Sequence, residues 1–219
     1  MFSWIISYGK GVCLGSTLCM LGYVLDYTVS VTSQTRIIKE KGDIFVKAHQ
    51  HIVENLMVIS PFVYALIDQT LLKHTYNFSW VTYSSLIVTH NLGYFFVHRE
   101  MHRNRELYQY HKFHHCFDKI VSPSIGNAVS REEFCMAYIA PFIFGALIFQ
   151  PTELTFVSSI GTIGLFNLLI HMYELKDITW VSGMVSPQKH ITHHDVKNKN
   201  YSAPVIDLDA ISDYVFVDP

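Results

Sequence analysis

Long apolar runs alternate with polar segments along most of the chain. Two early runs occupy residues 11–31 and 52–72, and a third occupies residues 78–97, directly before His98. At a rise of 1.5 Å per residue, about 20 helical residues cross a hydrocarbon core of about 30 Å. The pattern therefore predicts three membrane-spanning helices in the first half of the chain.

The first two runs each allow a second interpretation. The first could be a signal peptide, but it has no clear small-x-small cleavage site, so we expect a retained helix. The second carries Glu54 and Asp68 near its ends, which leaves a short apolar centre. It can span a membrane only if these charges reach the interface or are paired.

Two further runs, residues 134–149 and 154–170, are separated by only four residues. Such a short connection predicts a tight helical hairpin. Each run is close to the lower length limit for a span, and Pro141 with several glycines could bend it, so a re-entrant hairpin is the alternative. In both cases the chain returns to the side of the membrane that it left.

Composition agrees with a membrane protein. Half of the residues are hydrophobic, only 16% are charged, and the mean hydropathy is positive. The fold class predicted is all-α, an integral membrane helical bundle of four to five spans with a histidine-rich helical cap. A net charge of −2 offers no basic surface for nucleic acid. Cys13, Cys19, Cys116 and Cys135 have no spacing that indicates a disulfide framework or a thiolate zinc site.

Basic residues are unevenly distributed between the polar segments. Lysines and arginines gather in residues 36–47, 99–131 and 176–199, whereas residues 73–77 hold only Lys73 and the hairpin tip holds none. The positive-inside rule places the basic segments, and with them the cap, in the cytosol. We expect residues 1–50 to form a span and a basic cytosolic loop, residues 51–205 a catalytic domain, and residues 206–219 an acidic tail.

Histidines supply the candidate chemistry, because nine of the thirteen lie in spaced clusters after residue 97. His98 and His102 are four residues apart, and the pattern HxxHH occurs twice. On a helix such spacing puts imidazoles on one face, where they can share a metal ion. Nine imidazoles exceed the needs of one ion, so two ions are expected, with iron, zinc, copper and nickel all open. The nine candidate ligands are His98, His102, His111, His114, His115, His171, His190, His193 and His194.

Several histidines also have an ordinary structural interpretation. A lone pair of histidines at a helix end is usually a surface feature, but the repeated HxxHH argues against that here. His171 ends an apolar run and could simply be a packing residue. His90, two turns before His98, is expected to pack or to support a ligand. A metalloprotease is excluded because Glu100 does not occupy the position that such motifs require. The remaining histidines, expected at the surface, are His49, His51 and His74.

The clusters resemble those of a known family. Residues 98–115 read HREMHRNRELYQYHKFHH and residues 190–202 read HITHHDVKNKNYS. They resemble the fatty acid hydroxylase/sterol desaturase superfamily of integral membrane oxygenases over residues 50–205. Pro123 and Glu133 also fall where that family has a proline and a glutamate. The segment from His171 to Leu175 resembles a shortened HSGYEL motif of the sterol C4-methyl oxidase branch, which favours His171 as a ligand.

This resemblance implies a specific chemistry. A cytosolic cap would hold two non-haem irons through the nine histidines, activate O2, and oxidise a lipid C–H bond by sterol methyl oxidation or by sterol or fatty-acyl hydroxylation or desaturation. Electrons would come from NAD(P)H through a reductase, often with cytochrome b5, in the endoplasmic reticulum of a eukaryotic cell. Ser202 replaces the family's glycine after Asn-Tyr, and the segment around His171 lacks the family's glycine beside Tyr173. These departures leave the substrate branch open.

Carboxylates near the clusters are candidates to orient the imidazoles. Asp195 is favoured because it follows His194 directly. The other candidates are Asp177, Glu132 and Glu133. Acidic residues also mark the C-terminal tail, which we expect to be docked or loosely ordered; they are Asp207, Asp209, Asp213 and Asp218.

Two other classes of function remain as alternatives. One is a catalytically silent relative that serves as a metal- or lipid-binding membrane scaffold. The other is a zinc-dependent membrane hydrolase or a metal transporter. Transporters usually place their ligands near the bilayer midplane, whereas these clusters lie at the ends of predicted spans.

Overall fold

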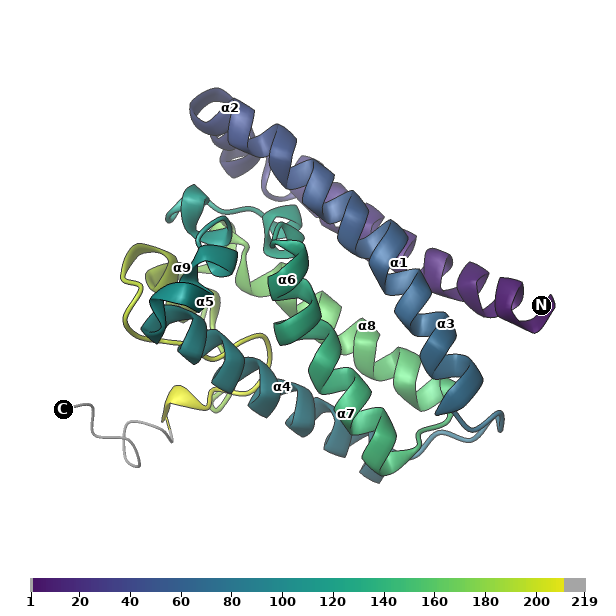
Figure 1. The fold of residues 1–219 in the computed structure, drawn as a ribbon. Coiled ribbons are helices and arrows are strands. Elements are labelled where there is room, and N and C mark those ends of the chain that lie inside the picture. Colours follow the sequence, from purple (N-terminus) through teal and green to yellow (C-terminus); the bar gives the residue numbers. More distant parts are fainter. Residues whose placement is uncertain (1, 211–219) are drawn as a thin grey trace.

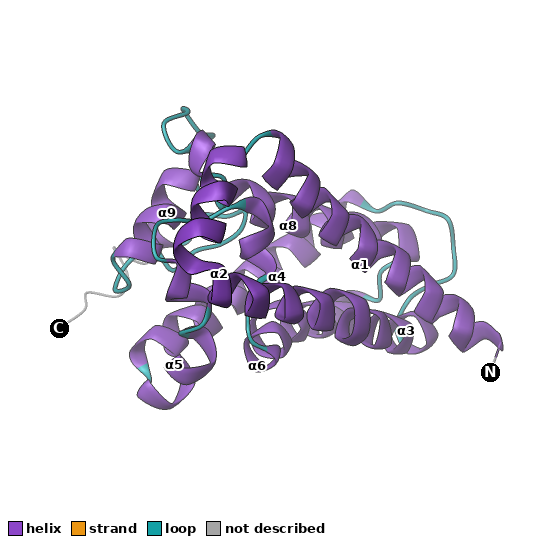
Figure 2. Cartoon of the chain, turned by 90° about the horizontal axis from the view of Figure 1, so that it is seen from above, coloured by secondary structure: helices purple, strands orange, loops and turns teal. Residues whose placement is uncertain are grey.

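A computed structural model describes residues 2–210, which form helices joined by short loops (Figure 1). None of these residues forms a strand, and the predicted all-α class is confirmed (Figure 2). Four helical segments are long and apolar enough to cross a membrane, in agreement with the predicted four to five spans. They are Phe2–Thr28, Val31–Thr70, Arg131–Phe149 and Glu153–Ile170.

The N-terminal helices differ from the predicted boundaries. Helix α1 (Phe2–Thr28) begins before the predicted span, and helix α2 (Val31–Glu54) includes the basic residues that we expected in a cytosolic loop. The loop prediction is wrong because this segment is an amphipathic helix. Its apolar residues Ile37, Ala48 and Ile52 are buried, while Lys39 and Lys47 are exposed.

Helix α2 continues through a π-helical turn, η1 (Asn55–Ile59), into helix α3 (Ser60–Thr70), which runs back along α1. Two glycines of α1 make this close contact possible. A Cβ atom on Gly15 would lie 1.9 Å from the Leu56 carbonyl oxygen, and one on Gly11 would lie 2.7 Å from the Cα of Pro61. Small residues commonly allow membrane helices to approach in this way.

Each π-helical stretch in the described chain directly precedes a helix with proline in its first turn. Pro61 follows η1, and Pro141 follows η4 (Phe134–Ile139) at the start of helix α7 (Ala140–Phe149). A proline lacks the amide hydrogen and its ring displaces the carbonyl four residues earlier. The wider π-turn accommodates that displacement without ending the helix.

The predicted helical hairpin is confirmed. Its first arm runs through α6 (Arg131–Glu133), η4 and α7, and its second arm is helix α8 (Glu153–Ile170). Gln150 makes the turn with a positive φ of 44°. Thr152 then caps α8, because its side chain accepts a hydrogen bond from the Thr155 amide.

Helix α4 (Trp80–Arg103) is the one predicted span that is absent from the four membrane-crossing segments. The polar side chains of His90 and Asn91 interrupt its apolar run. Asn91 also holds a non-helical segment against α4, since its Oδ1 accepts hydrogen bonds of 3.0 Å from the amides of Val205 and Ile206. Non-helical backbone is not stable in contact with lipid, so we infer that protein covers α4 at this position.

The first part of the C-terminal tail is docked, as predicted. Asp209 accepts hydrogen bonds from the backbone amides of Tyr201 and Ser202, at 2.9 and 2.7 Å. Asp207 forms an ion pair with Lys189. The predicted tail residues Asp213 and Asp218 lie outside the described residues.

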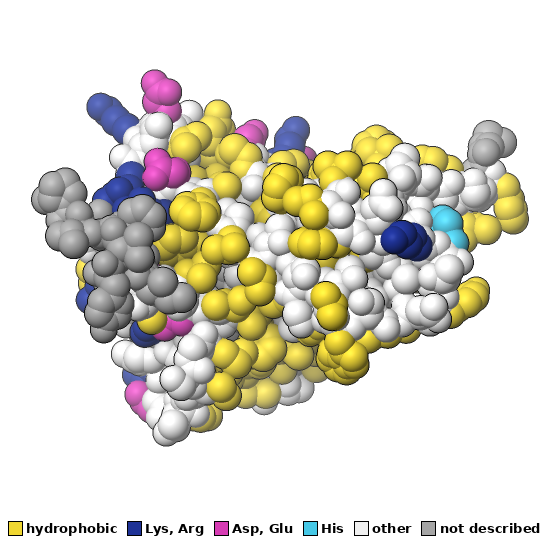
Figure 3. Space-filling view, turned by 90° about the horizontal axis from the view of Figure 1, so that it is seen from below, with side chains coloured by type: hydrophobic (Ala, Val, Ile, Leu, Met, Phe, Trp, Pro, Cys, Tyr) yellow, Lys and Arg dark blue, Asp and Glu magenta, His cyan; other side chains and the backbone are white. Residues whose placement is uncertain are grey.

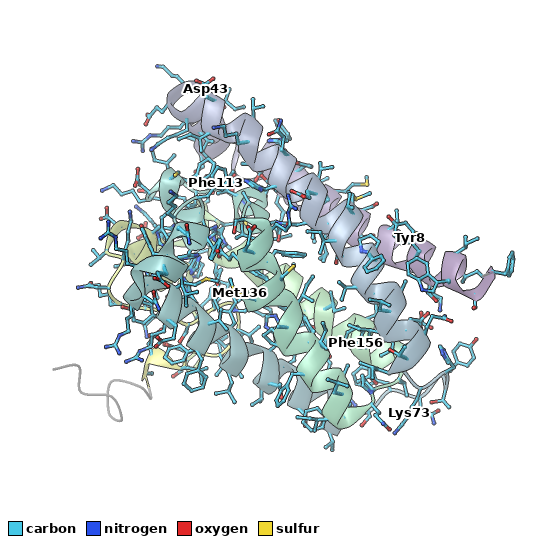
Figure 4. All side chains as sticks on the ribbon, viewed as in Figure 1. Tyr8, Asp43, Lys73, Phe113, Met136 and Phe156 are labelled. Atoms are coloured by element: carbon cyan, nitrogen blue, oxygen red, sulfur yellow. The ribbon has the colours of Figure 1, made fainter. Side chains whose placement is uncertain are left out.

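The two ends of the bundle have different chemistry. At one end Lys10 pairs with Glu153 at 2.6 Å and lies 3.8 Å from Asp68, which ties α1, α3 and α8 together. The charge on Asp68 is thus paired, as its place in a span requires. In Figure 4 the labels Tyr8 and Lys73 mark this end, while Phe113 lies toward the opposite end. All histidine clusters lie at the opposite end. This agrees with the prediction that the helical hairpin returns the chain to the side of the membrane that it left.

The outer surface carries many large apolar side chains. Figure 3 shows them over the middle of one face, with most charged side chains toward one end and one edge. Exposed examples on α3, α4 and α7 are Phe62, Val88, Phe96, Phe144 and Leu147. A soluble monomer rarely exposes so many large apolar residues, so we assign this surface to contact with lipid.

Candidate metal centre

Helix α4 carries the first two histidines to the end of the bundle, where His98 and His102 lie on consecutive turns. Asn104 reverses the chain and caps helix α5 (Arg105–His111) by accepting a hydrogen bond of 2.8 Å from the Glu106 amide. A short 3-10 helix, η2 (His114–Phe117), follows α5. This compact turn brings the first HxxHH motif back against α4.

The other histidines come from the last two helices. His171 lies directly after α8, and helix α9 (Pro187–Asp195) carries the second HxxHH motif next to it. The turn η3 (Pro123–Asn127) packs against His171 so closely that a Cβ on Gly126 would lie 2.6 Å from its Nδ1. Glycine is therefore required at position 126.

The structure brings all nine predicted histidines together in two adjacent groups. Within each group, one nitrogen from every ring lies within 4.8 Å of the others. The groups adjoin, because the ring centroids of His115 and His194 are 4.9 Å apart. The five-histidine group comprises His98, His102, His111, His115 and His193. The four-histidine group comprises His114, His171, His190 and His194.

Each HxxHH motif contributes to both groups. In the first motif the outer pair, His111 and His115, joins the five-histidine group, while His114 joins the other. In the second motif the arrangement is reversed, and only His193 joins the five-histidine group. Residues four apart lie one above the other on a helix, and the third residue is rotated away from them. This geometry lets the single helix α9 supply ligands to two neighbouring ions, whereas the first motif extends from the end of α5 into η2.

The distances between ring nitrogens fit shared metal ions. The Nε2 atom of His98 lies 3.0 Å from that of His111 and 3.1 Å from that of His193. In the four-histidine group, His171 Nε2 lies 2.8 Å from His190 Nε2 and 3.3 Å from His114 Nε2. With metal–nitrogen bonds of about 2.1 Å, ligands at right angles on one ion are about 3 Å apart.

Backbone carbonyls fix the orientation of three of these rings. The Nδ1 atoms of His98, His171 and His193 each lie 2.7 Å from a carbonyl oxygen, belonging to Tyr201, Asn167 and Lys199 respectively. A carbonyl only accepts, so Nδ1 carries the hydrogen and Nε2 presents its lone pair to the centre. Residue types alone gave no signal for these three carbonyls.

Burial keeps the imidazoles neutral. It lowers the pKa of His193 to about 4, from an ordinary value of 6.5. Burial, and after it the repulsion between neighbouring rings, lowers the pKa of the other histidines on α5, η2 and α9 well below the ordinary value of 6.5. These histidines are His111, His114, His115, His190 and His194.

Neutral rings in these orientations need a cation between them. The Nε2 lone pairs of His98 and His193 face each other at 3.1 Å, which is unfavourable without a positive charge. His194 is fully buried, and no protein group hydrogen bonds either of its nitrogens. All-imidazole donor sets suit iron as well as zinc, copper and nickel. The residues present therefore fit two metal ions, one in each group.

The carboxylate that orients a ring is Glu133, so the preference for Asp195 was wrong. Glu133 is buried, and its Oε1 accepts a hydrogen bond of 2.7 Å from His111 Nδ1. Asp195 is exposed and lies 3.8 Å from Lys119. Glu132, beside Glu133, is also exposed. Such carboxylate–histidine pairs are typical supports of metal ligands.

The other described histidines lie outside both groups. His90 is buried farther down α4, and no protein group hydrogen bonds its ring nitrogens. His49 and His51 are half-buried rather than exposed, since His49 stacks on Tyr23 and His51 contacts Phe113. Only His74 is a surface residue as predicted.

A comparison with family models identifies the chain. The model of the family described as fatty acid hydroxylase matches residues 83–213, more than half of the sequence. The chain belongs to the fatty acid hydroxylase family. No curated protein matches it, and no solved structure does. The match includes most of α4 and all nine histidines, so family membership and the geometry of the two groups agree on the same part of the molecule.

Proposed function

We propose that this fatty acid hydroxylase family member is a membrane-bound non-haem diiron oxygenase that oxidises a C–H bond of a lipid acyl chain. The observation that carries the proposal is the pair of adjacent, buried, neutral histidine groups at one end of an apolar helical bundle. Neither group includes a cysteine or a carboxylate ligand, so bound ions would keep their full positive charge.

The nine histidines would hold the two irons, and the irons would supply O2 activation and the oxidising power for a C–H bond. The protein contributes the geometry. Glu133 and the carbonyls of Asn167, Lys199 and Tyr201 keep the rings aimed inward. Of the nine ligands only His102 is partly exposed, so the rest of the centre is shielded from water.

An apolar cavity in the bundle supports an acyl substrate. It lies between α1, α3, α4, α7 and α8, and it reaches Asn167, whose carbonyl orients His171. Its volume is about 90 Å³. An apolar cavity of about 150 Å³ accommodates benzene, so this smaller one excludes the fused rings of a sterol and, as it stands, holds only a few methylene groups of a hydrocarbon chain. We therefore prefer acyl oxidation to the sterol branch.

Electrons are proposed to arrive from NAD(P)H through a reductase, with or without cytochrome b5. His102 lines an open depression together with Tyr108, Lys197 and Tyr201. This is where a donor protein would come nearest to the ligands. The distribution of lysine and arginine supports a cytosolic location for this face. In a eukaryotic cell, the proposed membrane is that of the endoplasmic reticulum.

Lipid profiling of cells tests the proposed function. Cells that produce the chain are expected to contain hydroxylated or desaturated acyl lipids that control cells lack. Cells with the variant His114→Ala/His193→Ala, which loses one ligand in each group, are expected to resemble the controls. An unchanged lipid profile would contradict an oxygenase and favour the silent scaffold. A change confined to sterols would contradict the choice of acyl chain.

A further inference from the structure

The apolar cavity contains a polar residue that the metal centre does not use. His90 projects from the middle of α4, is 0% exposed, and lines the cavity. Its ring lies 4.4 Å from that of Phe142, and most of the other lining residues are apolar. An ionisable side chain at such a depth in a membrane bundle is costly and is usually retained for a function.

Neither ring nitrogen of His90 hydrogen bonds to a protein group. The backbone of Tyr138 is a polar neighbour, but it does not form a hydrogen bond of acceptable geometry. The hydroxyl group of Tyr138, which also lines the cavity, is buried as well, and its neighbour Tyr94 forms no hydrogen bond of acceptable geometry with it. Unpaired buried polar groups each destabilise a fold by about 1–3 kcal/mol and therefore need a partner.

Both π-helical stretches border this cavity. The segment η1 contributes Leu56, and η4 contributes Phe134, Tyr138 and Ile139. Such stretches widen a helix locally and occur frequently at functional sites. The floor is formed by Phe156, labelled in Figure 4, with its ring 6.5 Å from that of Tyr64 and 5.7 Å from that of Phe142.

The position of His90 along α4 sets its distance from the metal ligands. It precedes His98 by eight residues, which corresponds to about 12 Å along the helix axis. An acyl chain that entered from the histidine end would reach His90 partway along the cavity, and the lining side chains would have to move apart for it to extend toward Phe156.

We propose that His90 hydrogen bonds an oxygen carried partway along the acyl chain in this cavity, so that the protein selects chains that already bear a mid-chain hydroxyl group. The inference rests on the proposed function for the identity of the chain as an acyl substrate. A hydroxyl group both donates and accepts, so it satisfies either nitrogen of a neutral ring. The Tyr138 hydroxyl group offers a second contact from the opposite helix.

Binding of a matched pair of fatty acids tests this selection. Ricinoleic acid is oleic acid with an added mid-chain hydroxyl group. Competition of each acid against a fluorescent fatty acid, on the full chain in detergent micelles, gives the two affinities. The unmodified chain is expected to bind ricinoleic acid about tenfold more tightly, which is the effect of one well-formed hydrogen bond. Equal affinities, or no binding of either acid, overturn the proposal.

Variants locate the preference at His90. His90→Leu is expected to abolish the tenfold ratio, and His90→Gln, which keeps a hydrogen-bonding side chain, to retain part of it. His49→Leu is the matched control, because His49 packs between α1 and α2 away from the cavity. A ratio that His90→Leu leaves unchanged overturns the proposal.

The unfolding temperature separates ligand recognition from a structural role. Without ligand, His90→Leu is expected to unfold at a higher temperature than the unmodified chain, because leucine removes two unpaired buried nitrogens. A lower unfolding temperature indicates a structurally bonded histidine and overturns the proposal. Neither measurement requires turnover, so failure of the oxygenase test would leave both results unaffected.

Discussion

Replacement of His171 and His190 with alanine is expected to remove one metal ion per chain and to leave the other bound. Both residues belong to the four-histidine group, which would retain only His114 and His194. The five-histidine group keeps all of its ligands in this variant. Elemental analysis of the purified chain measures the ion content, and unchanged content would refute the assignment of the four-histidine group.

A second double variant tests whether both groups bind metal. His114→Ala/His193→Ala removes one ligand from each group, so we expect weaker binding of both ions and loss of most of the metal. The matched control is His49→Ala/His51→Ala, which also removes two histidines but leaves both groups intact. If that control lost as much metal as the ligand variants, general unfolding would explain the result.

Glu133→Gln is expected to weaken metal binding by about tenfold or more, in line with other carboxylates that support histidine ligands. The substitution keeps the size of the side chain but replaces the carboxyl group that faces His111 Nδ1 at 2.7 Å with an amide. Competition with a chelator measures the affinity. The neighbouring variant Glu132→Gln should bind metal normally, because Glu132 is exposed.

Asp195→Asn separates the two candidate carboxylates. Asp195 is exposed near Lys119, so this variant should also bind metal normally. A loss of affinity in Asp195→Asn, with normal affinity in Glu133→Gln, would reverse the assignment.

Eight of the nine histidines were predictable because their spacing is local, whereas His171 was indicated only by the family resemblance. His111 and His115, or His190 and His194, are one helical turn apart in any α-helix, so the sequence alone indicates that they share a face. The division of each HxxHH motif between two groups was not predictable. It depends on how α5, α9 and the end of α8 pack around one another, which is a property of the tertiary structure.

The prediction that Asp195 orients an imidazole relied on its nearness to His194 in sequence, and it was wrong. Asp195 follows His194 directly, but adjacent residues on a helix point about 100° apart, so their side chains diverge. Glu133 is far from His111 in sequence and reaches it because α6 packs against α5. The basic residues of α2 led to a second wrong prediction. Their charges suggested a loop, but the segment is an amphipathic helix in which Ile37 and Ile52 are buried.

Native mass spectrometry of the intact chain, purified without added metal, tests the central claim most directly. The mass is expected to exceed that of the polypeptide by two metal ions, with elemental analysis identifying both as iron. This follows from two adjacent groups of neutral imidazoles in a fatty acid hydroxylase family member. A chain that carries a single ion, no ion, or two zinc ions would contradict the diiron account.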